Sequence, residues 1–554
     1  MKQHVTAALL ALSAAAAPAA AQQVVRTPAR AALLGGDDEE RARLAQLRAG
    51  AHADSLDGFL LRSASSRAER LGRAARDASG DTLFLAPWWP ELNVVHNSGL
   101  PYTLNDGALW AGRGTSGSVT GGVRARYRFL HLTLAPTVVY SQNADFDLPN
   151  DPRFFDQAPP FPRSPYSYPW RIIGSSIDLP LRFGDEPYQR LDLGQSALHA
   201  ELGSVEAGFS NENEWWGPGV RNALIMSTNA PGIPKLFVRT ARPLRTRVGT
   251  VEARYVLGSL ATSPYFEVTD EPRRGRSLSA AAVTLRPALA PTLTLGFARS
   301  VFAQTGDGET LGHAFDVLSS TGRPNARPST DPAQSPGRDQ LYSFFARYVL
   351  PDDGFESYLE WGRTEVPKNF RDLLVSPNHT QGYTLGLQYA RPLRSAARTL
   401  RVQAEVTNVA QSSTFRQRPT GSWYTSRAAL QGYTQRGQVI GAAIGPGGSS
   451  QWLAGDLFTP RWSAGLFAGR VRWDDDAFYV TQKPIGGFCR HDVSVLGGVR
   501  GSARSGAGSF NAALTVASRL NVFYQNSRPC LSGVGPRVDT RNLTLSLGYV
   551  PRGW

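Results

Sequence analysis

The chain has 554 residues, a formal net charge of +14, 41% hydrophobic residues and two cysteines. Two cysteines are too few for a disulfide-rich fold or a cysteine-rich zinc site. Beyond residue 21 no run of 18 or more apolar residues occurs, which excludes a transmembrane helix from the mature chain. The mature chain is therefore expected to be either exported and soluble or inserted in a membrane as a β-barrel.

Residues 1–21 are predicted to be a secretory signal peptide. Lys2 gives a short positive start, residues 5–17 are apolar, and Ala19-Ala20-Ala21 fits the small-residue cleavage pattern. The mature chain is then expected to begin at Gln22. The alternative, an N-terminal membrane anchor, is disfavoured because the apolar run is short and rich in alanine.

The basic residues are almost all arginine. Lysine occupies four positions, so 55 of the 59 basic residues are arginine. Codon usage in a GC-rich genome would explain part of the preference for arginine over lysine. It does not explain the excess of positive charge. Guanidinium groups pair bidentately with carboxylates and phosphates. An exported basic protein is therefore expected to meet anionic glycans or lipid head groups, with no nucleic-acid partner.

Residues 22–80 are predicted to form an N-terminal periplasmic helical segment. Between residues 37 and 77, charged and apolar residues mix at helical spacing, and three glycines interrupt the pattern. Two short helices are expected there. The residues that carry this pattern are Leu44, Leu47, Leu56, Phe59 and Leu60, with Gly50, Gly58 and Gly72 as breaks.

From residue 81 to residue 554 the pattern changes to a period of two. The clearest segment is at the C-terminus, where Leu543, Leu545 and Leu547 alternate with polar residues. Apolar and polar faces that alternate over about 9–11 residues, with aromatic ends, are typical of transmembrane β-strands. The predicted fold is an all-β, antiparallel outer-membrane barrel of roughly 16–18 strands.

The polar faces of these segments are predicted to line a wet or ion-paired lumen. Arg124, Arg126 and Arg128 share one face, opposite apolar residues. A soluble β-sandwich, with a solvated outer face, is the alternative. The long connections, about 141–198, 303–339 and 408–461, are expected to be extracellular, because the extracellular loops of such barrels are the long ones.

The two cysteines can be placed by the direction of the strands. If the last strand runs toward the periplasm, alternation puts Cys489 and Cys530 in loops on the extracellular side. A disulfide between them is predicted; two unpaired thiols are the alternative.

The segment from Asn211 to Asn229 is the densest cluster of unusual residues. Glu212 and Glu214 invite comparison with a glycosidase acid pair, but ion pairs with lumen arginines are the default interpretation. The adjacent tryptophans are expected to be structural, either in an aromatic girdle or in a packed plug. The cluster comprises Glu212, Glu214, Trp215, Trp216, Arg221 and Asn229.

Catalytic and cofactor motifs are otherwise weak. No histidine spacing suggests a metal site, no Gly-x-Ser-x-Gly elbow occurs, and the Gly112–Gly117 stretch lies before a strand instead of a helix. No metal, no cofactor and no catalysis are therefore expected. Sugar contact is instead predicted in the long loops, where aromatic rings stack on pyranoses and arginines pair with acidic sugars. The candidates are Arg163, Tyr166, Trp170, Arg171, Trp423 and Tyr424.

The chain resembles the Wzi-type capsule assembly family. The resemblance is carried by Asn97–Pro101, Asn105–Trp110, Ile177–Pro180, Trp215–Gly219 with Asn229, and Glu360–Arg363. It implies a Gram-negative outer-membrane barrel with periplasmic helices that binds or anchors capsular or other acidic polysaccharide without catalysis. The expected partners are that polysaccharide, outer-membrane lipid and the barrel assembly machinery, and a monomer is expected. The alternative is a porin or transporter for small anions, with lumen arginines that give selectivity.

Overall fold

The fold comes from a computed structural model that describes residues 36–48, 59–63, 83–148, 165–170, 172–266, 275–305, 309–319, 337–393, 395–481, 491–524 and 539–551. The predicted signal peptide lies outside these residues, as do Arg163, Arg171, Cys489 and Cys530. The disulfide stays a prediction. No helix among the described residues is long and apolar enough to cross a bilayer.

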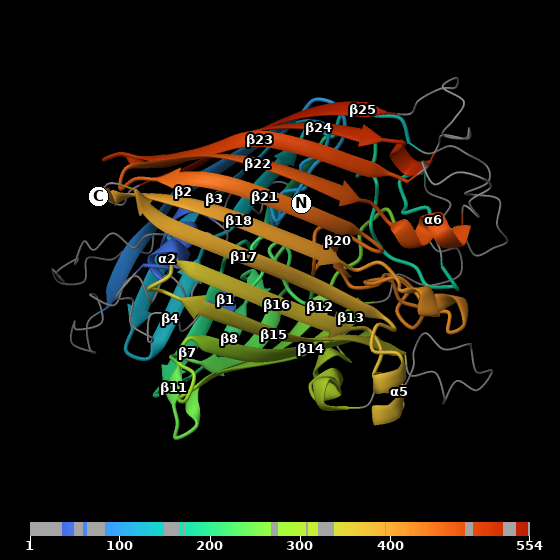
Figure 1. The fold of residues 1–554 in the computed structure, drawn as a ribbon, viewed down its shortest axis with the longest axis horizontal. Helices are drawn as coiled ribbons and strands as arrows, with labels where there is room; N and C mark the ends of the chain where they lie inside the picture. Colours follow the sequence, from blue (N-terminus) through green and yellow to red (C-terminus); the bar gives the residue numbers. More distant parts are fainter. Residues whose placement is uncertain are drawn as a thin grey trace, which may run out of the picture.

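Within the described residues, 21 strands form one closed antiparallel barrel (Figure 1). Three pairs of short strands each occupy one strand position in the wall: β4 and β5 along β3, β6 and β7 along β5 and β4, and β10 and β11 along β12. The wall therefore has 18 strand positions. The first wall strand closes the barrel on the last through the pairing of residues 92–97 with residues 544–549. The predicted transmembrane barrel of 16–18 strands is confirmed, and the sandwich is excluded.

The wall strands have the following bounds: β2 (Phe84–Asn97), β3 (Gly114–Tyr127), β4 (Leu130–Leu134), β5 (Thr137–Ser141), β6 (Tyr188–Asp192), β7 (Ala197–Leu202), β8 (Val205–Ser210), β10 (Lys235–Thr240), β11 (Leu244–Arg245), β12 (Gly249–Leu260), β13 (Gly275–Pro287), β14 (Leu293–Thr305), β15 (Arg338–Leu350), β16 (Phe355–Arg363), β17 (Gln381–Leu393), β18 (Ser395–Asn408), β21 (Ser449–Phe458), β22 (Trp462–Arg472), β23 (Val493–Arg504), β24 (Gly508–Leu520) and β25 (Thr540–Pro551).

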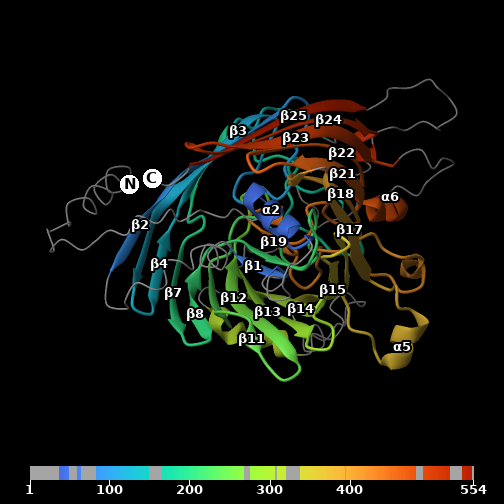
Figure 2. The ribbon, with the colours of Figure 1, turned by 60° about the vertical axis from the view of Figure 1, so that its left-hand side comes forward.

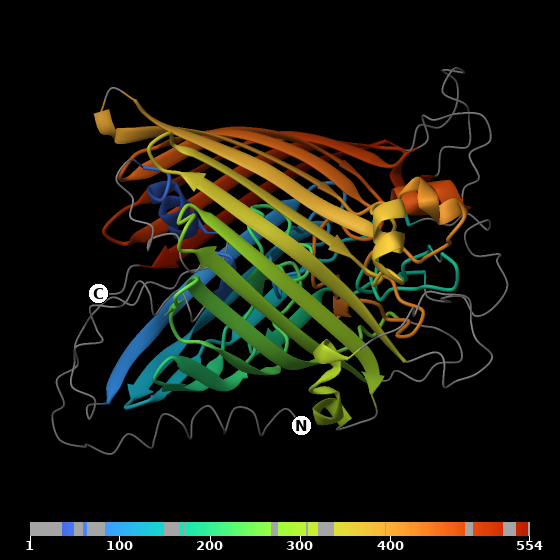
Figure 3. The same ribbon diagram turned by 60° about the horizontal axis from the view of Figure 1, so that its bottom comes forward.

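The period of two in the sequence becomes an apolar outer belt and a polar lumen. In β25, Leu543 and Leu547 are exposed on the outside, whereas Asn542 and Thr544 are buried in the interior. Pro136 falls between β4 and β5, where its missing N–H costs no ladder hydrogen bond. The strands cross the wall obliquely (Figure 3), as closure of a barrel requires.

The two ends of the barrel differ in their connections. At the end where the C-terminus lies, here called the turn end, connections have at most five residues. At the opposite end, the loop end, the connections are residues 98–113, 142–187, 211–234, 261–274, 306–337, 364–380, 409–448, 473–492 and 521–539. Short helices accompany these loops: η3 (Glu309–His313), η4 (Asp316–Leu318), α5 (Phe370–Val375), η6 (Ser413–Arg416), α6 (Asp475–Thr481) and η8 (Val522–Tyr524).

Two of the three predicted long connections are shorter than expected. The 141–198 prediction contains β6 and the start of β7, and the 408–461 prediction contains β21. The polar start of β21, from Ser449 to Gln451, and Gly455 within it weaken the apolar alternation that marks a strand. The 303–339 prediction matches the loop between β14 and β15 closely.

The N-terminal segment contributes α2 (Asp37–Ala45), which lies inside the barrel near the turn end (Figure 2). Of the two predicted helices, this one is present. Residues 59–63, placed in the second helix by their spacing, are extended and include β1 (Leu61–Ser63). Pairing of this strand with a lumen strand overrides the helical pattern. Residues 22–35, 49–58 and 64–80 lie outside the described part.

The lumen is filled by segments here called the lumen plug: residues 59–63, 211–234 and 422–448. Its strands are β1, β9 (Glu214–Trp216), β19 (Thr434–Gln435) and β20 (Gln438–Val439). An apolar core joins Trp216, Leu224 and Tyr433 of the plug to inward residues of the wall such as Phe302 and Phe345. The plug therefore packs against the wall as a protein interior does.

Candidate functional site

The paired tryptophans of the 211–229 segment lie in the lumen plug. β9 pairs antiparallel with β1, with Trp216 opposite Leu61 and Trp215 opposite Arg62. Trp216 is fully buried, and its indole N–H donates to Glu214 at 3.2 Å. The guanidinium of Arg62 stands 5.1 Å from the ring centre of Trp215. Of the two structural interpretations, the packed plug is correct and the girdle is wrong.

The acids of this segment are held by basic residues of the wall. Glu214 accepts from Arg254 at 2.6 Å, and both side chains are buried. Burial opposes ionisation of Glu214, but Arg254 and Lys235 outweigh it and lower the pKa of Glu214 below its ordinary value. The Glu212 carboxylate accepts from Ser210, and its backbone carbonyl accepts from Lys235. The ion-pair interpretation is confirmed for Glu214.

The Gly-Pro-Gly turn after β9 is tied to the wall by one carboxylate. Glu405 of β18 accepts from three consecutive backbone N–H groups: Val220 at 2.6 Å, Asn222 at 2.9 Å, and the residue between them, Arg221, at 3.1 Å. A Cβ on Gly219 would lie 2.0 Å from the carbonyl oxygen of Asn222. The turn thus needs glycine to form this anion-binding arrangement of amides.

The remaining predicted members of the cluster serve the same plug. The guanidinium of Arg221 lies 5.0 Å from the ring centre of Trp452 on the wall. Asn229 donates to the carbonyl of Val439 at 2.9 Å and accepts from the backbone of Asn105. The six residues therefore join the plug to itself, to the wall and to the 98–113 loop.

At the turn end, α2 is held in the lumen by ion pairs. Glu40 contacts Arg401 at 3.0 Å and Arg500 at 3.3 Å. Burial would raise the pKa of Glu40, but Arg500 and Arg401 outweigh it and lower this pKa to about 2. Arg43 donates to Glu356 on the wall at 3.0 Å and to the carbonyl of Pro218 at 2.7 Å. α2 is thus fastened to both the wall and the plug.

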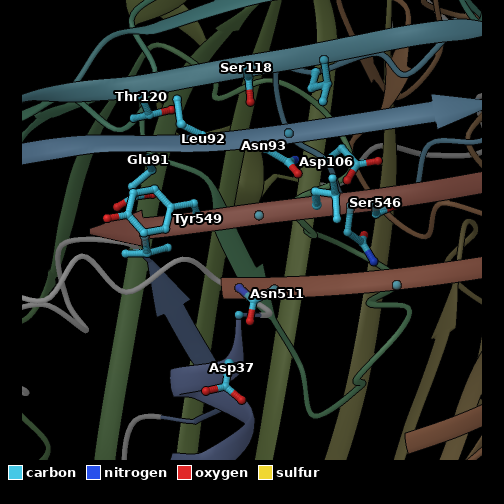
Figure 4. Close-up of a pocket in the computed structure, with 18 of the residues that line it drawn as sticks. Asp37, Glu91, Leu92, Asn93, Asp106, Ser118, Thr120, Asn511, Ser546 and Tyr549 are labelled. Atoms are coloured by element: carbon cyan, nitrogen blue, oxygen red, sulfur yellow. The ribbon is translucent and has the colours of Figure 1, made fainter. Parts of the chain in front are cut away.

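A cavity of about 390 Å³ with a mixed polar and apolar lining lies beside α2, against the wall strands β2, β3, β24 and β25 (Figure 4). Burial raises the pKa of Asp106, which lines it, to about 6. Its other lining groups include Asp37, Glu40, Glu91, Asn93, Ser118, Thr120, Arg500, Asn511 and Ser546. Mixed small polar groups of this kind suit ordered water and small solutes.

A second pocket, here called the loop-end pocket, has a volume of about 210 Å³ and is mainly apolar. It is lined by residues of four loops (98–113, 142–187, 473–492 and 521–539), by Arg519 of β24, and by Asn229 and residues 437–446 of the lumen plug. Aromatic residues dominate its wall: Tyr102, Trp110, Phe146, Tyr168, Trp170, Trp473, Phe523 and Tyr524. Such a lining can stack on the apolar faces of sugars or other flat ligands.

Few polar groups reach the loop-end pocket. Arg519 donates to both carboxylate oxygens of Asp492, at 2.7 and 2.6 Å. Burial and the nearby Asp476 carboxyl raise the pKa of Asp474 well above its ordinary value. The hydroxyl of Tyr168 is buried and has no hydrogen-bond partner among the described residues.

Of the four predicted glycan contacts that the structure describes, only Trp170 lies in this pocket, where its ring is 5.4 Å from that of Tyr524. Tyr166 is partly exposed nearby and donates to Asp185. Trp423 and Tyr424 are 2% and 1% exposed within the lumen plug. A sugar at the loop surface cannot reach their rings without rearrangement. Arg163 and Arg171 lie outside the described residues.

The sequence pattern did not reveal the other pocket residues. Trp473 and Asp474 begin a Trp-Asp-Asp-Asp run at the end of β22, and an aromatic residue next to consecutive acids at a strand end could have marked the site. Tyr168, Phe523 and Tyr524 carry no such signal, because the loops that hold them converge only in the folded barrel.

The predicted basic lumen face is confirmed only in part. Arg124 lies over the ring of Trp88 at 4.2 Å, and Arg126 follows on the same face of β3. Arg128 is different, because β3 ends at Tyr127 and Arg128 occupies the following turn with φ of +52°. The tight turn ends the strand before the third arginine, so Arg128 is at the turn end and not on the lumen wall.

These features define a plugged, 18-stranded β-barrel with an apolar outer belt, which is the class of the outer-membrane β-barrels. Residues 103–455 match the family model described as capsule assembly protein Wzi. This match spans more than half of the chain, and the chain belongs to that family.

One solved structure supports the fold. The structure of Wzi from Escherichia coli, described as an outer-membrane protein involved in group 1 capsule assembly and a carbohydrate-binding β-barrel, is similar with a TM-score of 0.54 and 12% identity. The match covers 94% of this chain and 95% of that one. OccK2 (OpdF) from Pseudomonas aeruginosa matches with a TM-score of 0.36 and 10% identity, over 83% of this chain and 96% of that one. No curated protein sequence matches the chain.

Proposed function

We propose that the protein is a non-enzymatic outer-membrane barrel that binds and holds capsular or other surface polysaccharide at the cell surface. The observation that carries this proposal is the aromatic loop-end pocket, which four loops and one side of the packed lumen plug build together. Family membership and the carbohydrate binding described for the E. coli Wzi barrel support it.

The orientation follows from the connections. Short turns face the periplasm and long loops face outward in bacterial outer-membrane barrels. The loop-end pocket then opens toward the cell exterior, α2 lies at the periplasmic end of the lumen, and the apolar belt contacts outer-membrane lipid. The protein acts as a monomer that the barrel assembly machinery inserts.

The absence of catalysis is supported by the roles of two acids that hold the lumen plug, Glu214 and Glu405. Glu214 is paired with Arg254, and Glu405 is saturated by backbone amides and by the hydroxyl of Tyr358. Neither carboxylate is placed as a general acid or base. Within the described ranges, no group of three or more His, Cys, Asp or Glu residues is arranged to hold a metal ion.

A second candidate is a porin for small anions. It is favoured by the cavity of about 390 Å³ beside α2 and by Arg500, which lines this cavity. The packed plug opposes it, because Trp216, Leu224 and Tyr433 close an apolar core across the lumen. Conductance in planar bilayers separates the two functions: the proposal expects little current, and large steady anion currents favour the porin.

The proposal is tested in cells by deletion of the gene. The deletion strain should shed its surface polysaccharide into the medium, and the wild-type gene should restore retention. A strain that keeps all its polysaccharide without this protein contradicts the proposed function.

A further inference from the structure

Part of the outer wall of the barrel is covered by the protein's own chain. The neighbouring residues Ala280 and Leu341 belong to the lumen core, so the row of ladder partners beside them faces outward. All four side chains of that row are nevertheless at most 5% exposed. The row crosses β12–β15 near the loop end and consists of Leu257, Ser279, Val301 and Gln340.

The cover is formed by residues 309–319 of the connection between β14 and β15, here called the wall segment. Its helices η3 and η4 pack on β12, β13 and β14. The hydroxyl of Ser279 donates to the carbonyl of Ala314 at 3.0 Å. Arg299, which faces outward two residues before Val301, donates to the carbonyl of Val317 at 2.8 Å. Polar side chains of the outer wall are thus satisfied by the backbone of the wall segment.

The wall segment lies beside the lipid-facing belt and not above it. Its partner Ser279 is four residues below the loop-end limit of β13, and its partner Arg299 is six residues below that of β14. At about 3.3 Å per residue and a strand tilt of about 40°, these positions are roughly 10–15 Å below the strand ends. β13 has 13 residues and rises roughly 33 Å at that tilt, whereas the belt of such barrels is about 25 Å tall. Even if the whole excess lies at the loop end, the wall segment is at the level of the bilayer.

The wall segment turns an apolar face away from the barrel. Leu311, Phe315 and Leu318 are 69%, 78% and 77% exposed. Large apolar side chains that cluster in the open are a mark of an interaction surface. Nearer the turn end, the outward residues Val283 and Phe344 are exposed as part of the apolar belt. The wall segment therefore covers a polar area of the wall and extends the belt over it.

The connection between β16 and β17 carries a second apolar group on the same side of the barrel. Tyr342, which faces outward as the ladder partner of Arg299, donates to the carbonyl of Glu365 at 3.3 Å. The connection 364–380 therefore also begins on the outer face. Its helix α5 has three apolar side chains that are 72%, 65% and 72% exposed: Phe370, Leu374 and Val375.

Basic groups lie at the loop-end margin of this apolar surface. Arg338, the first residue of β15, pairs with Asp316 of the wall segment at 2.6 Å, and its side chain stays 32% exposed. Lys368 and Arg371 are exposed beside the apolar residues of α5. Apolar side chains bordered by basic ones suit the boundary between acyl chains and anionic head groups. In the outer leaflet of an outer membrane, that boundary belongs to a phosphorylated glycolipid.

We propose that the wall segment and α5 form a docking surface for the phosphorylated glycolipid of the outer leaflet. Its acyl chains lie on the apolar residues, and its phosphate groups lie at the basic ones. The inference goes beyond polysaccharide binding and relies only on the orientation of the barrel given above. A second copy of the chain is the other occupant that an apolar surface of this kind can take, and the experiment separates the two.

The test is photo-cross-linking of the full protein in native outer membranes, with mass spectrometry of the adducts. Phe315→p-benzoylphenylalanine places the photoreactive group on the wall segment. Phe344→p-benzoylphenylalanine is the control on the belt, and Tyr479→p-benzoylphenylalanine is the control on α6, which follows the loop end of β22. We expect glycolipid adducts at position 315, lipid adducts at position 344 and no lipid adduct at position 479.

Three results overturn the inference, and none depends on whether the protein binds polysaccharide. A cross-linked dimer in place of lipid at position 315 assigns the surface to a second copy. Glycerophospholipid of the periplasmic leaflet as the sole adduct there contradicts the orientation. Lipid capture at position 344 without any at position 315 shows that the wall segment does not meet the bilayer.

The basic residues are tested by the paired change Lys368→Gln and Arg371→Gln. The glycolipid that copurifies in mild detergent should fall about threefold, because exposed ionic contacts contribute little each. The matched pair Lys368→Arg and Arg371→Lys keeps both charges and should retain the wild-type amount. Both variants must show the heat-resistant barrel on electrophoresis. Equal glycolipid in the two variants overturns the assignment of the phosphate groups to these residues.

Discussion

The two ends of the lumen are closed by different chemistry. At the turn end, α2 is held by ion pairs: Glu40 to Arg401 and Arg500, and Arg43 to Glu356. Toward the loop end, the plug is a packed apolar and aromatic core around Trp216. Ion pairs depend on pH, whereas apolar packing responds mainly to lost volume. The turn end is therefore expected to be the adjustable closure, and the plug the permanent one.

The largest effect is expected from Trp216→Ala. Removal of a fully buried indole from the plug should cost about 3–5 kcal/mol in local stability, because a cavity remains. Hydrogen exchange of the backbone amides in residues 211–234 measures this cost. Trp462→Ala is the matched control: this tryptophan is exposed on the outer face, and its replacement should leave plug exchange unchanged. Unchanged exchange in Trp216→Ala would show that the plug is not held by its core.

A smaller effect is expected from Glu405→Ala. The carboxylate accepts from three consecutive backbone amides; the buried amide of Asn222 loses its acceptor at a cost of about 1–3 kcal/mol, whereas the partly buried amides of Val220 and Arg221 can bond to water. Exchange at residues 220–222 should accelerate while that of β18 does not. Glu405→Gln, which retains one acceptor oxygen, should recover part of the protection. If both variants exchange alike, the carboxylate does not order the turn.

Acid should weaken the attachment of α2. The pKa of Glu40 in the folded protein is about 2, below the ordinary 4.5. A lowered carboxyl pKa stabilises the folded form fully above about pH 4.5, and this stabilisation is lost as the pH falls toward 2. Pepsin cleavage within residues 37–45, normalised to an exposed peptide, should rise over that interval. Glu40→Gln should be cleaved at all these pH values. If pepsin cleavage of the wild type within residues 37–45 does not change with pH, the proposed contrast between the two ends is contradicted.

The smallest effect is expected from Arg221→Lys. Lysine keeps the charge over Trp452 but loses the planar stack, which is worth about 0.5–1 kcal/mol at a partly exposed site. A slight increase in exchange at residues 220–222, well below that of Glu405→Ala, is the expected result. An effect as large as that of Glu405→Ala would place the main attachment of this turn at Trp452.

The wall of the barrel could be predicted from the sequence, because a period of two is a local pattern that a membrane strand must show. The lumen plug and the loop-end pocket could not be predicted in this way. Trp423 and Tyr424 have the composition of a surface glycan site, yet their loop folds inward and buries them beside Leu224. Tyr168 and Trp473 meet only after distant loops converge. Such sites depend on tertiary placement, which residue spacing does not encode.

The most direct test of the account is equilibrium binding of the producing bacterium's own purified surface polysaccharide to the intact protein in micelles, with Trp170→Ala as the comparison. Both proteins must first show the same heat-resistant barrel on electrophoresis. The account predicts saturable binding to the wild type and at least a tenfold weaker affinity for the variant, because Trp170 lines the loop-end pocket. Absence of saturable binding, or equal affinity in the two proteins, would contradict it.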